Sequence, residues 1–346
     1  MHDPSEMPRR LAAFLTDEEP GVSDVVVTSY EVMTGGYSRL LARARVQWRR
    51  EGVVETTTFV LRGDPPPERS LIDTDRRAEW ELLHAVAGRS RIAAPRYFDD
   101  DGRRLGTRAI VLDHSPATSL LPYCSARVDT GLGDLPVRLA EAAAAVHTMP
   151  LDDVPAGIAR PAGYDDYLTA RIDEWRRTDA AHIERDPFLR WVAAWLDAHR
   201  PPPVPLTLIH GDFQSANMLV ADDGHIVLLD WELAQIGDPR EDLGYFKAVA
   251  QAAPPDLTDD ERFFARYREL TGMDESQFNP AVLGYFLILG VIGTVRRLLE
   301  GGAAFAEGRN HLLASLFNLN SVQFGHMMWL QAADQLSAVL AEDGAA

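Results

Sequence analysis

The chain has 346 residues, of which 46% are hydrophobic, and it carries a formal net charge of −18 at pH 7. This length and apolar content are enough for a buried core in one large domain or two ordinary domains, which excludes disordered and fibrous proteins. The negative charge argues against a nucleic-acid partner, because binding a phosphate backbone requires a clustered basic surface.

The sequence gives no sign of a membrane or an oxidising compartment. The polar, acidic start of the chain predicts no secretory signal. The apolar stretch 281–295 is shorter than the roughly 20 residues of a membrane-spanning helix, so we expect a buried core helix there. The single cysteine, Cys124, excludes an internal disulfide framework and a cysteine-rich zinc site. We therefore expect a cytoplasmic protein without a membrane partner.

Residues 25–111 contain short runs typical of β-strands, which alternate with turn signals such as the Gly35-Gly36 pair. One segment, 75–87, instead repeats apolar residues at helical spacing. Two further strand-like runs follow around 95–98 and 108–112. The sequence therefore predicts a small antiparallel sheet with one helix in this part of the chain.

After residue 114 the pattern changes to long helices. We expect helices over 135–149, 164–178 and 187–200, and another that opens with a capping box at Thr258 and stops at Gly272. The C-terminal third is predicted to be helical and mostly core. This change divides the chain into an N-terminal part, 1–113, and a C-terminal part, 114–346, and it predicts an α+β fold.

The most informative segment is His210-Gly211-Asp212, with Asn217 five residues after the aspartate and Asp230 thirteen residues after Asn217. Residues 217–220 and 226–229 predict two short strands, so that Asn217 begins one strand and Asp230 follows the other. Phosphoryl transfer needs one carboxylate aimed at the attacking hydroxyl, and an amide oxygen and a second carboxylate that hold magnesium against nucleotide phosphates. The segment supplies all three groups and predicts a phosphotransfer site.

These motifs resemble the catalytic loop and metal-binding strand of the aminoglycoside phosphotransferase family, a branch of the protein-kinase-like fold. That family also includes choline kinases, fructosamine kinases and kinase domains fused to acyl-CoA dehydrogenases. The resemblance implies a two-lobed fold. A nucleotide-binding N-lobe, 1–113, would hold the small antiparallel sheet and its one helix, and a larger, mainly helical C-lobe, 114–346, would carry catalysis and substrate binding. It also implies ATP as co-substrate and Mg²⁺ as cofactor.

The resemblance assigns roles to five residues around the motif. It makes Asp212 the group that orients or deprotonates the substrate hydroxyl, and it makes Asn217 and Asp230 the magnesium ligands. His210 is then a structural residue of the loop and not a general base. Asp242, in the later Gly237–Leu243 segment, resembles the family's second aspartate, which braces the catalytic loop.

Two other segments resemble nucleotide-binding parts of the family. The turn with Gly35, Gly36 and Ser38 resembles the turn that covers the phosphates, where glycines let the backbone approach and the hydroxyl can donate to a phosphate oxygen. A plain hairpin is the alternative. Asp113 and His114 occupy the place of the hinge that would bind adenine through its backbone, and a plain linker is the alternative. Backbone recognition leaves the choice between ATP and GTP open.

The sequence departs from the family at Arg62, where the predicted strand 57–62 ends. Kinases place a lysine there, which grips the α- and β-phosphates and pairs with a helix glutamate, here Glu79. Arginine keeps the charge and can bind phosphate bidentately, but it is longer and planar. Three explanations stay open: a working substitution, which fits a chain whose basic residues are all arginine except Lys247, a weakened kinase, or a retired nucleotide-binding fold.

The acceptor is also open. Glu232, Asp165 and Asp166 are acidic residues that could form the family's substrate face and would suit an aminoglycoside or another amine. In a chain with 52 acidic residues, each of them taken singly is expected to belong to the solvated surface. Residues 265–272 and the helical segment after them resemble the kinase domains associated with acyl-CoA dehydrogenases, which favours a hydroxylated metabolic acceptor. No oligomeric state follows from the sequence.

Two hypotheses of function follow. The first is a cytoplasmic kinase that depends on ATP and magnesium and phosphorylates a hydroxyl group of a small molecule. The second is a nucleotide-binding scaffold, a pseudokinase without transfer activity, and it is suggested by Arg62 in the place of the kinase lysine. A protein kinase fits less well, because the sequence offers no Asp-Phe-Gly after the loop and no recognisable activation segment between Asp230 and Asp242.

Overall fold

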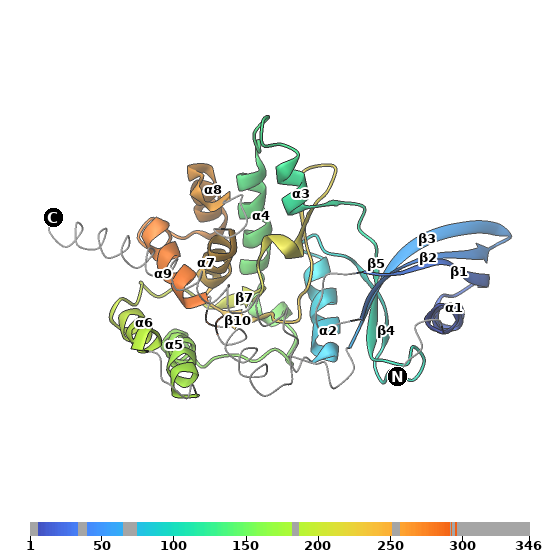
Figure 1. The fold of residues 1–346 in the computed structure, drawn as a ribbon, viewed down its shortest axis with the longest axis horizontal. Helices are drawn as coiled ribbons and strands as arrows, with labels where there is room; N and C mark the ends of the chain where they lie inside the picture. Colours follow the sequence, from blue (N-terminus) through green and yellow to red (C-terminus); the bar gives the residue numbers. More distant parts are fainter. Residues whose placement is uncertain are drawn as a thin grey trace. The chain divides into compact units, whose positions relative to one another are not determined.

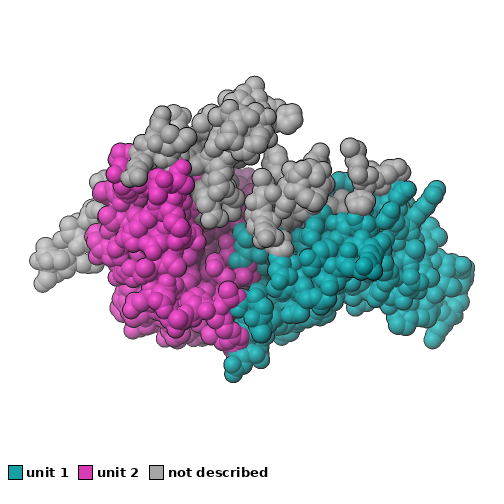
Figure 2. Space-filling view, turned by 90° about the horizontal axis from the view of Figure 1, so that it is seen from below, with its two compact units in different colours: residues 1–118, 152–158, 219–233 teal, residues 119–151, 159–218, 234–346 magenta. Residues whose placement is uncertain are grey.

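The computed structural model describes residues 6–33, 40–64, 75–181, 187–250, 257–290, 292 and 295. The chain forms two compact units, which Figure 2 shows in different colours. Unit 1 consists of residues 1–118, 152–158 and 219–233, and unit 2 consists of residues 119–151, 159–218 and 234–346. The division predicted between residues 113 and 114 therefore lies close to the first boundary, while two later segments of the chain return to unit 1.

Unit 1 contains a five-stranded antiparallel sheet with the strand order β1-β2-β3-β5-β4 (Figure 1). Its strands are β1 (Val22–Val32), β2 (Leu40–Arg50), β3 (Val53–Gly63), β4 (Pro95–Asp99) and β5 (Ala109–Asp113). The predicted small antiparallel sheet is thus confirmed. Arg62 lies on the central strand β3, opposite Leu41 on one side and Ile110 on the other.

Two helices accompany this sheet. Helix α1 (Met7–Glu18) packs its apolar residues against the sheet in the same core as Ala44 and Phe59. This helix was not predicted, although its buried residues Met7, Leu11 and Phe14 recur at helical spacing. Helix α2 (Arg76–Ala87) is the predicted helix, and the side chain of Asp75 caps its start by accepting from two backbone amides.

Unit 2 is mainly helical, as predicted. Its helices are α3 (Leu120–Ser125), α4 (Leu135–His147), α5 (Tyr164–Ala181), α6 (Pro187–Ala198), α7 (Pro239–Ala250), α8 (Glu261–Thr271) and α9 (Pro280–Gly290). Helix α8 ends at Gly272, which has φ +73°, as the sequence indicates. Its N-cap is Asp260 and not the predicted Thr258, because the Asp260 carboxylate accepts from the Arg262 amide and residues 257–259 form a separate 3₁₀ turn.

Short strands flank the predicted site motifs. Strand β7 (Thr207–Ile209) pairs with β10 (Gln235–Gly237) in unit 2. Strands β8 (Met218–Val220) and β9 (Ile226–Leu228) form the predicted hairpin, and β6 (Thr118–Ser119) extends the same sheet. Asn217 directly precedes β8 as the last residue of the 3₁₀ turn Ser215–Asn217.

The helices of the described ranges are too short or too polar to cross a bilayer. Helix α9, which covers the first part of the predicted apolar core helix, has 11 residues. Its residues from Leu283 to Gly290 are buried in unit 2, together with residues of α5 and α6. Residues 296–346, where the remainder of the helical C-terminal third was predicted, lie outside the described residues.

Candidate active site

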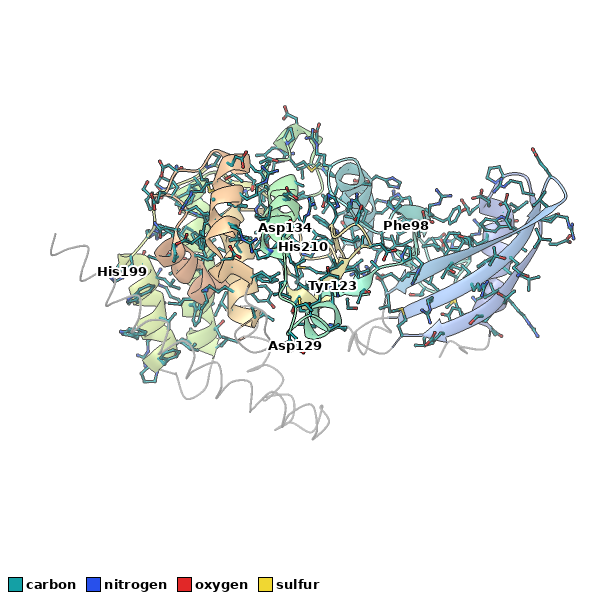
Figure 3. All side chains as sticks on the ribbon, turned by 90° about the horizontal axis from the view of Figure 1, so that it is seen from above. Phe98, Tyr123, Asp129, Asp134, His199 and His210 are labelled. Carbon is teal, nitrogen blue, oxygen red and sulfur yellow. The ribbon has the colours of Figure 1, made fainter. Side chains whose placement is uncertain are left out.

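The loop with the His-Gly-Asp motif begins where β7 ends. His210, which is labelled in Figure 3, belongs to unit 2 and is fully buried, and Gly211 has φ +77°, a conformation that glycine adopts without steric cost. The backbone amide of Asp212 donates to His210 Nδ1 at 3.3 Å. The histidine side chain therefore contacts the loop backbone from inside, and its purely structural role stays a prediction.

Asp242 fixes the backbone just before Asp212. It lies in the first turn of α7 and is only 1% exposed. Its Oδ2 accepts from the His210 amide at 2.6 Å, and its Oδ1 accepts from the Gly211 amide at 2.9 Å. Because hydrogen bonds to an ionised carboxylate are strong, this arrangement ties the loop to α7. These bonds suit the bracing role expected of Asp242, which stays a prediction.

The carboxylate of Asp212 is held by two side-chain amides. Gln214 Nε2 donates to its Oδ1 at 2.7 Å, and Asn217 Nδ2 donates to its Oδ2 at 2.7 Å. Asn217 Nδ2 also donates to the Asp212 carbonyl oxygen at 3.0 Å. An ionised carboxylate has about four lone-pair sites, so Asp212 can still accept from a further hydroxyl group. Gln214 was missed by sequence reasoning, although it lies inside the motif.

Asn217 and Asp230 offer the kind of ligand that magnesium prefers. With its Nδ2 directed at Asp212, the remaining polar atom of the Asn217 side chain is an amide oxygen. Asp230 supplies a carboxylate and has φ +66°, a backbone conformation that aspartate tolerates better than most residues. Mg²⁺ is commonly bound by one or two carboxylates together with substrate phosphates, so each of these residues supplies a type of ligand that fits the ion. Among the described residues, no group of three or more His, Cys, Asp or Glu residues could hold a metal.

In unit 1, Arg62 is surrounded by carboxylates. Its side chain is 7% exposed, its Nη1 donates to Glu79 of α2, and its Nη2 donates to Asp230. Glu232 Oε2 lies 3.4 Å from the same Nη2 and its side chain is also 7% exposed. The structure thus pairs Arg62 with the predicted partner Glu79. It places Glu232, predicted as a substrate residue, in the buried surroundings of Arg62.

A second arginine that sequence reasoning missed completes this arrangement. Arg76 lies one helical turn before Glu79, is fully buried, and donates to the other carboxylate oxygen of Glu79. It also donates to Asp64 Oδ1 at 2.9 and 2.7 Å. Burial disfavours its charge, but Glu79 and Asp64 outweigh this cost and raise the pKa of Arg76. We call the six residues of this group the Arg62 cluster: Arg62, Asp64, Arg76, Glu79, Asp230 and Glu232.

The predicted hinge residues Asp113 and His114 belong to unit 1, where their backbone amides are hydrogen-bonded. Gly35, Gly36 and Ser38 lie outside the described residues. The backbone amides of Asp113 and His114 donate to Ala94 and Thr58 within unit 1, at 2.8 and 3.1 Å. A nucleotide base at this place would therefore have to use other groups, such as the carbonyl oxygens.

Asp165 and Asp166, the two other predicted substrate residues, are exposed in the first turn of α5. Carboxylates are favourable at a helix N-terminus because they complement the helix dipole. This local role accounts for their position without a substrate, and their contact with an acceptor stays a prediction.

The phosphotransferase enzyme family matches residues 40–278, which is more than half of the chain. The chain is 35% identical over 83 residues to acyl-CoA dehydrogenase family member 10 of Mus musculus. That match covers 23% of this chain and 8% of the mouse protein, so the chain spans only a small part of this relative.

Solved structures cover nearly the whole chain. The apoenzyme of macrolide 2′-phosphotransferase MphH from Brachybacterium faecium has a TM-score of 0.60 and 20% identity, and covers 91% of this chain and 97% of its own. The GDP complex of an aminoglycoside 2′-phosphotransferase IIIa mutant has a TM-score of 0.62 and 16% identity, with coverage of 92% and 97%. At these identities the likeness establishes the fold alone, and it confirms the predicted α+β, two-lobed kinase-like class.

Proposed function

Because the chain belongs to the phosphotransferase enzyme family, we propose that it is a small-molecule kinase that uses ATP and magnesium to phosphorylate a hydroxyl group of its substrate. The family assignment confirms the resemblance inferred from the motifs. It makes phosphoryl transfer the reaction to be explained. ATP, magnesium and the hydroxyl acceptor are the further content of the proposal.

The observation that carries the proposal is the way Asp212 is held. Two amides orient its carboxylate, and a buried aspartate fixes the backbone in front of it. A carboxylate in a fixed orientation can accept a hydrogen bond from a substrate hydroxyl and aim the oxygen at a phosphorus atom. We infer that Asp212 orients the hydroxyl and takes up its proton as the transfer proceeds.

The reaction then balances as an in-line displacement. The substrate oxygen forms a bond to the γ-phosphorus of ATP, the bond from that phosphorus to the bridging oxygen breaks, and its electron pair stays on ADP. Asn217, through its amide oxygen, and Asp230 would hold magnesium. The ion, when bound, neutralises negative charge on the phosphates.

Arg62 supports a working enzyme more than a retired fold. It pairs with the helix glutamate Glu79, as a kinase lysine would, and its guanidinium contacts Asp230, a proposed magnesium ligand. Guanidinium groups bind phosphate oxygens through two parallel hydrogen bonds, so Arg62 can exchange a carboxylate for a phosphate. We propose that it grips nucleotide phosphates in the place of the lysine.

The acceptor is proposed at the level of a hydroxyl-bearing small molecule. An aminoglycoside acceptor is supported by the solved neighbour that is an aminoglycoside 2′-phosphotransferase. The match to acyl-CoA dehydrogenase family member 10 supports a second candidate, a hydroxyacyl metabolite. A screen of aminoglycosides, amino alcohols, sugars and hydroxyacyl compounds with Mg-ATP distinguishes these candidates by which class is phosphorylated.

The test of the proposal is Asp212→Ala in the full chain. We expect transfer to fall at least about a thousandfold, because both the orientation of the hydroxyl and its proton acceptor are lost. Affinity for Mg-ATP, measured by calorimetry, should change by less than about threefold. Asp129→Asn is the control, since Asp129 is exposed and belongs to neither group of site residues (Figure 3).

Full transfer by the Asp212→Ala chain would contradict the proposal. If the unmodified chain binds Mg-ATP tightly but phosphorylates none of the acceptors and hydrolyses no ATP, the scaffold hypothesis replaces it.

A further inference from the structure

His147 has no role in the function proposed above, yet it lies where three helices of unit 2 converge. It is the last residue of α4, and it is 3% exposed. Its Nε2 lies 3.0 Å from Asp242 Oδ2 on α7, and its Nδ1 lies 2.8 Å from the hydroxyl of Tyr267 on α8. A buried imidazole with a partner at each nitrogen has one defined orientation.

The partners also define the direction of these hydrogen bonds. An ionised carboxylate only accepts, so His147 Nε2 must carry the hydrogen that Asp242 receives. In the neutral ring Nδ1 is then an acceptor, and the Tyr267 hydroxyl donates to it. Tyr267 is fully buried, and burial raises its pKa well above the usual value, so its hydroxyl stays protonated. In a neutral imidazole, a hydrogen bond from the Tyr267 hydroxyl to Nδ1 therefore favours the tautomer that donates to Asp242.

Asp242 connects His147 to the loop backbone. Its Oδ2 receives both the His147 hydrogen and the His210 amide, while its Oδ1 receives the Gly211 amide. Without the imidazole, the carboxylate would lose the partner that opposes its rotation. The loop backbone immediately before Asp212 would then lose its fixed acceptor.

His147 also contacts the loop on the other side of Asp212. Its ring centroid lies 6.4 Å from that of Phe213, and the ring planes are inclined at 45°. Phe213 is fully buried and packs in addition against Phe246 of α7, with ring centroids 6.1 Å apart. The imidazole therefore borders both neighbours of Asp212, through a carboxylate before it and through an aromatic ring after it.

We propose that His147 is a positioning residue for Asp212, which it holds in place through Asp242 and Phe213. The catalytic role of Asp212 rests on the proposed function, whereas the ordering of the loop by His147 does not. This role requires the Nε2 hydrogen of His147 and not only the volume of its side chain. Two amide variants can test this difference.

His147→Gln and His147→Asn form the matched pair. A glutamine amide nitrogen reaches the place of Nε2 and can still donate to Asp242, whereas the shorter asparagine places its amide near Nδ1. Hydrogen exchange of the full chain, followed by NMR, reports the amides of His210 and Gly211. We expect their exchange to quicken at least about tenfold in His147→Asn and to stay within about threefold of the unmodified chain in His147→Gln.

Kinetics give the second measurement. A displacement of about 1 Å at a reacting group can cost about a hundredfold in rate, so we expect kcat of His147→Asn to fall about 30-fold or more. Its KM for Mg-ATP should stay within about threefold, and His147→Gln should recover most of the lost kcat. A histidine that only fills space would instead affect both variants alike and leave no such recovery.

The proposal is overturned if the amides of His210 and Gly211 exchange at the same rate in His147→Asn, in His147→Gln and in the unmodified chain. If His147→Asn does not fold, Tyr267→Phe replaces it, because this change removes only the hydroxyl that favours the donating tautomer, and it should quicken the same amides. If the unmodified chain transfers no phosphate, the proposed function fails, while amide exchange still decides the role of His147.

Discussion

The Arg62 cluster of unit 1 and the Asp242 brace of unit 2 both contain buried carboxylates, but these carboxylates bind different groups. In the Arg62 cluster, charged side chains hold other charged side chains, from Asp64 through Arg76 and Glu79 to Arg62. In the brace, which consists of Asp242, His147 and the amides of His210 and Gly211, a carboxylate holds backbone.

This difference determines what each group can tolerate. Side chains can rotate and exchange one anion for another, which supports the proposal that Arg62 accepts phosphate oxygens in the place of the lysine. Backbone amides cannot be exchanged without moving the loop. We therefore expect substitutions in the cluster to act mainly on nucleotide affinity, and substitutions in the brace to act mainly on turnover.

Among substitutions in the brace and in the Arg62 cluster, the largest effect is expected for Asp242→Asn. The amide group would place N–H donors against backbone amides that also donate, which leaves buried groups unpaired at a cost of about 3 kcal/mol in the free energy of unfolding. Displacement of Asp212 should lower kcat about a hundredfold or more, with KM for Mg-ATP nearly unchanged. Urea unfolding and steady-state kinetics measure the two effects. If KM for Mg-ATP rose while kcat stayed constant, the brace would act on nucleotide affinity, as we expect of the cluster.

For substitutions of Arg62 we expect the opposite pattern, in which nucleotide affinity falls more than turnover. Arg62→Met removes the cation from Glu79, Asp230 and Glu232, so affinity for Mg-ATP should fall about 10- to 100-fold. The free energy of unfolding should fall by about 3 kcal/mol, because buried carboxylates lose their partner. Arg62→Lys keeps the charge but replaces the two-pronged guanidinium by one nitrogen, and an intermediate loss is expected. Calorimetry measures the affinities without an acceptor. Unchanged binding in both variants would show that Arg62 does not grip the nucleotide phosphates.

Much of this arrangement could be predicted from the sequence. The sheet with its helix, the hairpin 218–228 and the loop around Asp212 follow from local patterns of apolar and turn residues. The pairing of Arg62 with Glu79 followed from the family pattern. Such features are encoded by spacing along the chain, which a single sequence displays.

The missed residues act across distances in the chain that spacing does not show. His147 lies 95 positions from Asp242, and only the packing of α4 on α7 and α8 brings them together. The burial of Glu232 likewise depends on the neighbourhood of Arg62 and not on its own segment. Arg76 is different, because its position one helical turn before Glu79 could have indicated an ion pair. Helix α1 also had a readable apolar pattern.

Gly237→Ala should have a smaller effect, which acts through the strand pair that precedes the loop. A Cβ atom at this position would lie 2.7 Å from Ile209 Cδ1 and 2.7 Å from the Tyr167 hydroxyl oxygen. Tyr167 cannot yield easily, because it is fully buried and donates to Glu241. We expect the free energy of unfolding to fall by about 1–3 kcal/mol and kcat to fall with it, since β10 pairs with β7.

Gly163→Ala is the control for this change, because a Cβ atom there would meet no heavy atom within 4 Å. Its stability should match that of the unmodified chain. A stable Gly237→Ala chain with unchanged kcat would show that the strand pair does not determine the position of the loop.

The smallest effect is expected for an ion pair on the same sheet as Arg62. Arg43 and Glu31 lie 2.6 Å apart, but their side chains are 47% and 61% exposed. Water solvates both charges in the folded and unfolded states, so Arg43→Gln should change the free energy of unfolding by less than about 0.5 kcal/mol. Urea unfolding compares this variant with Arg62→Met. If the two losses were equal, the charge of an arginine rather than its burial would set its contribution. Burial would then not explain why the Arg62 cluster contributes to stability.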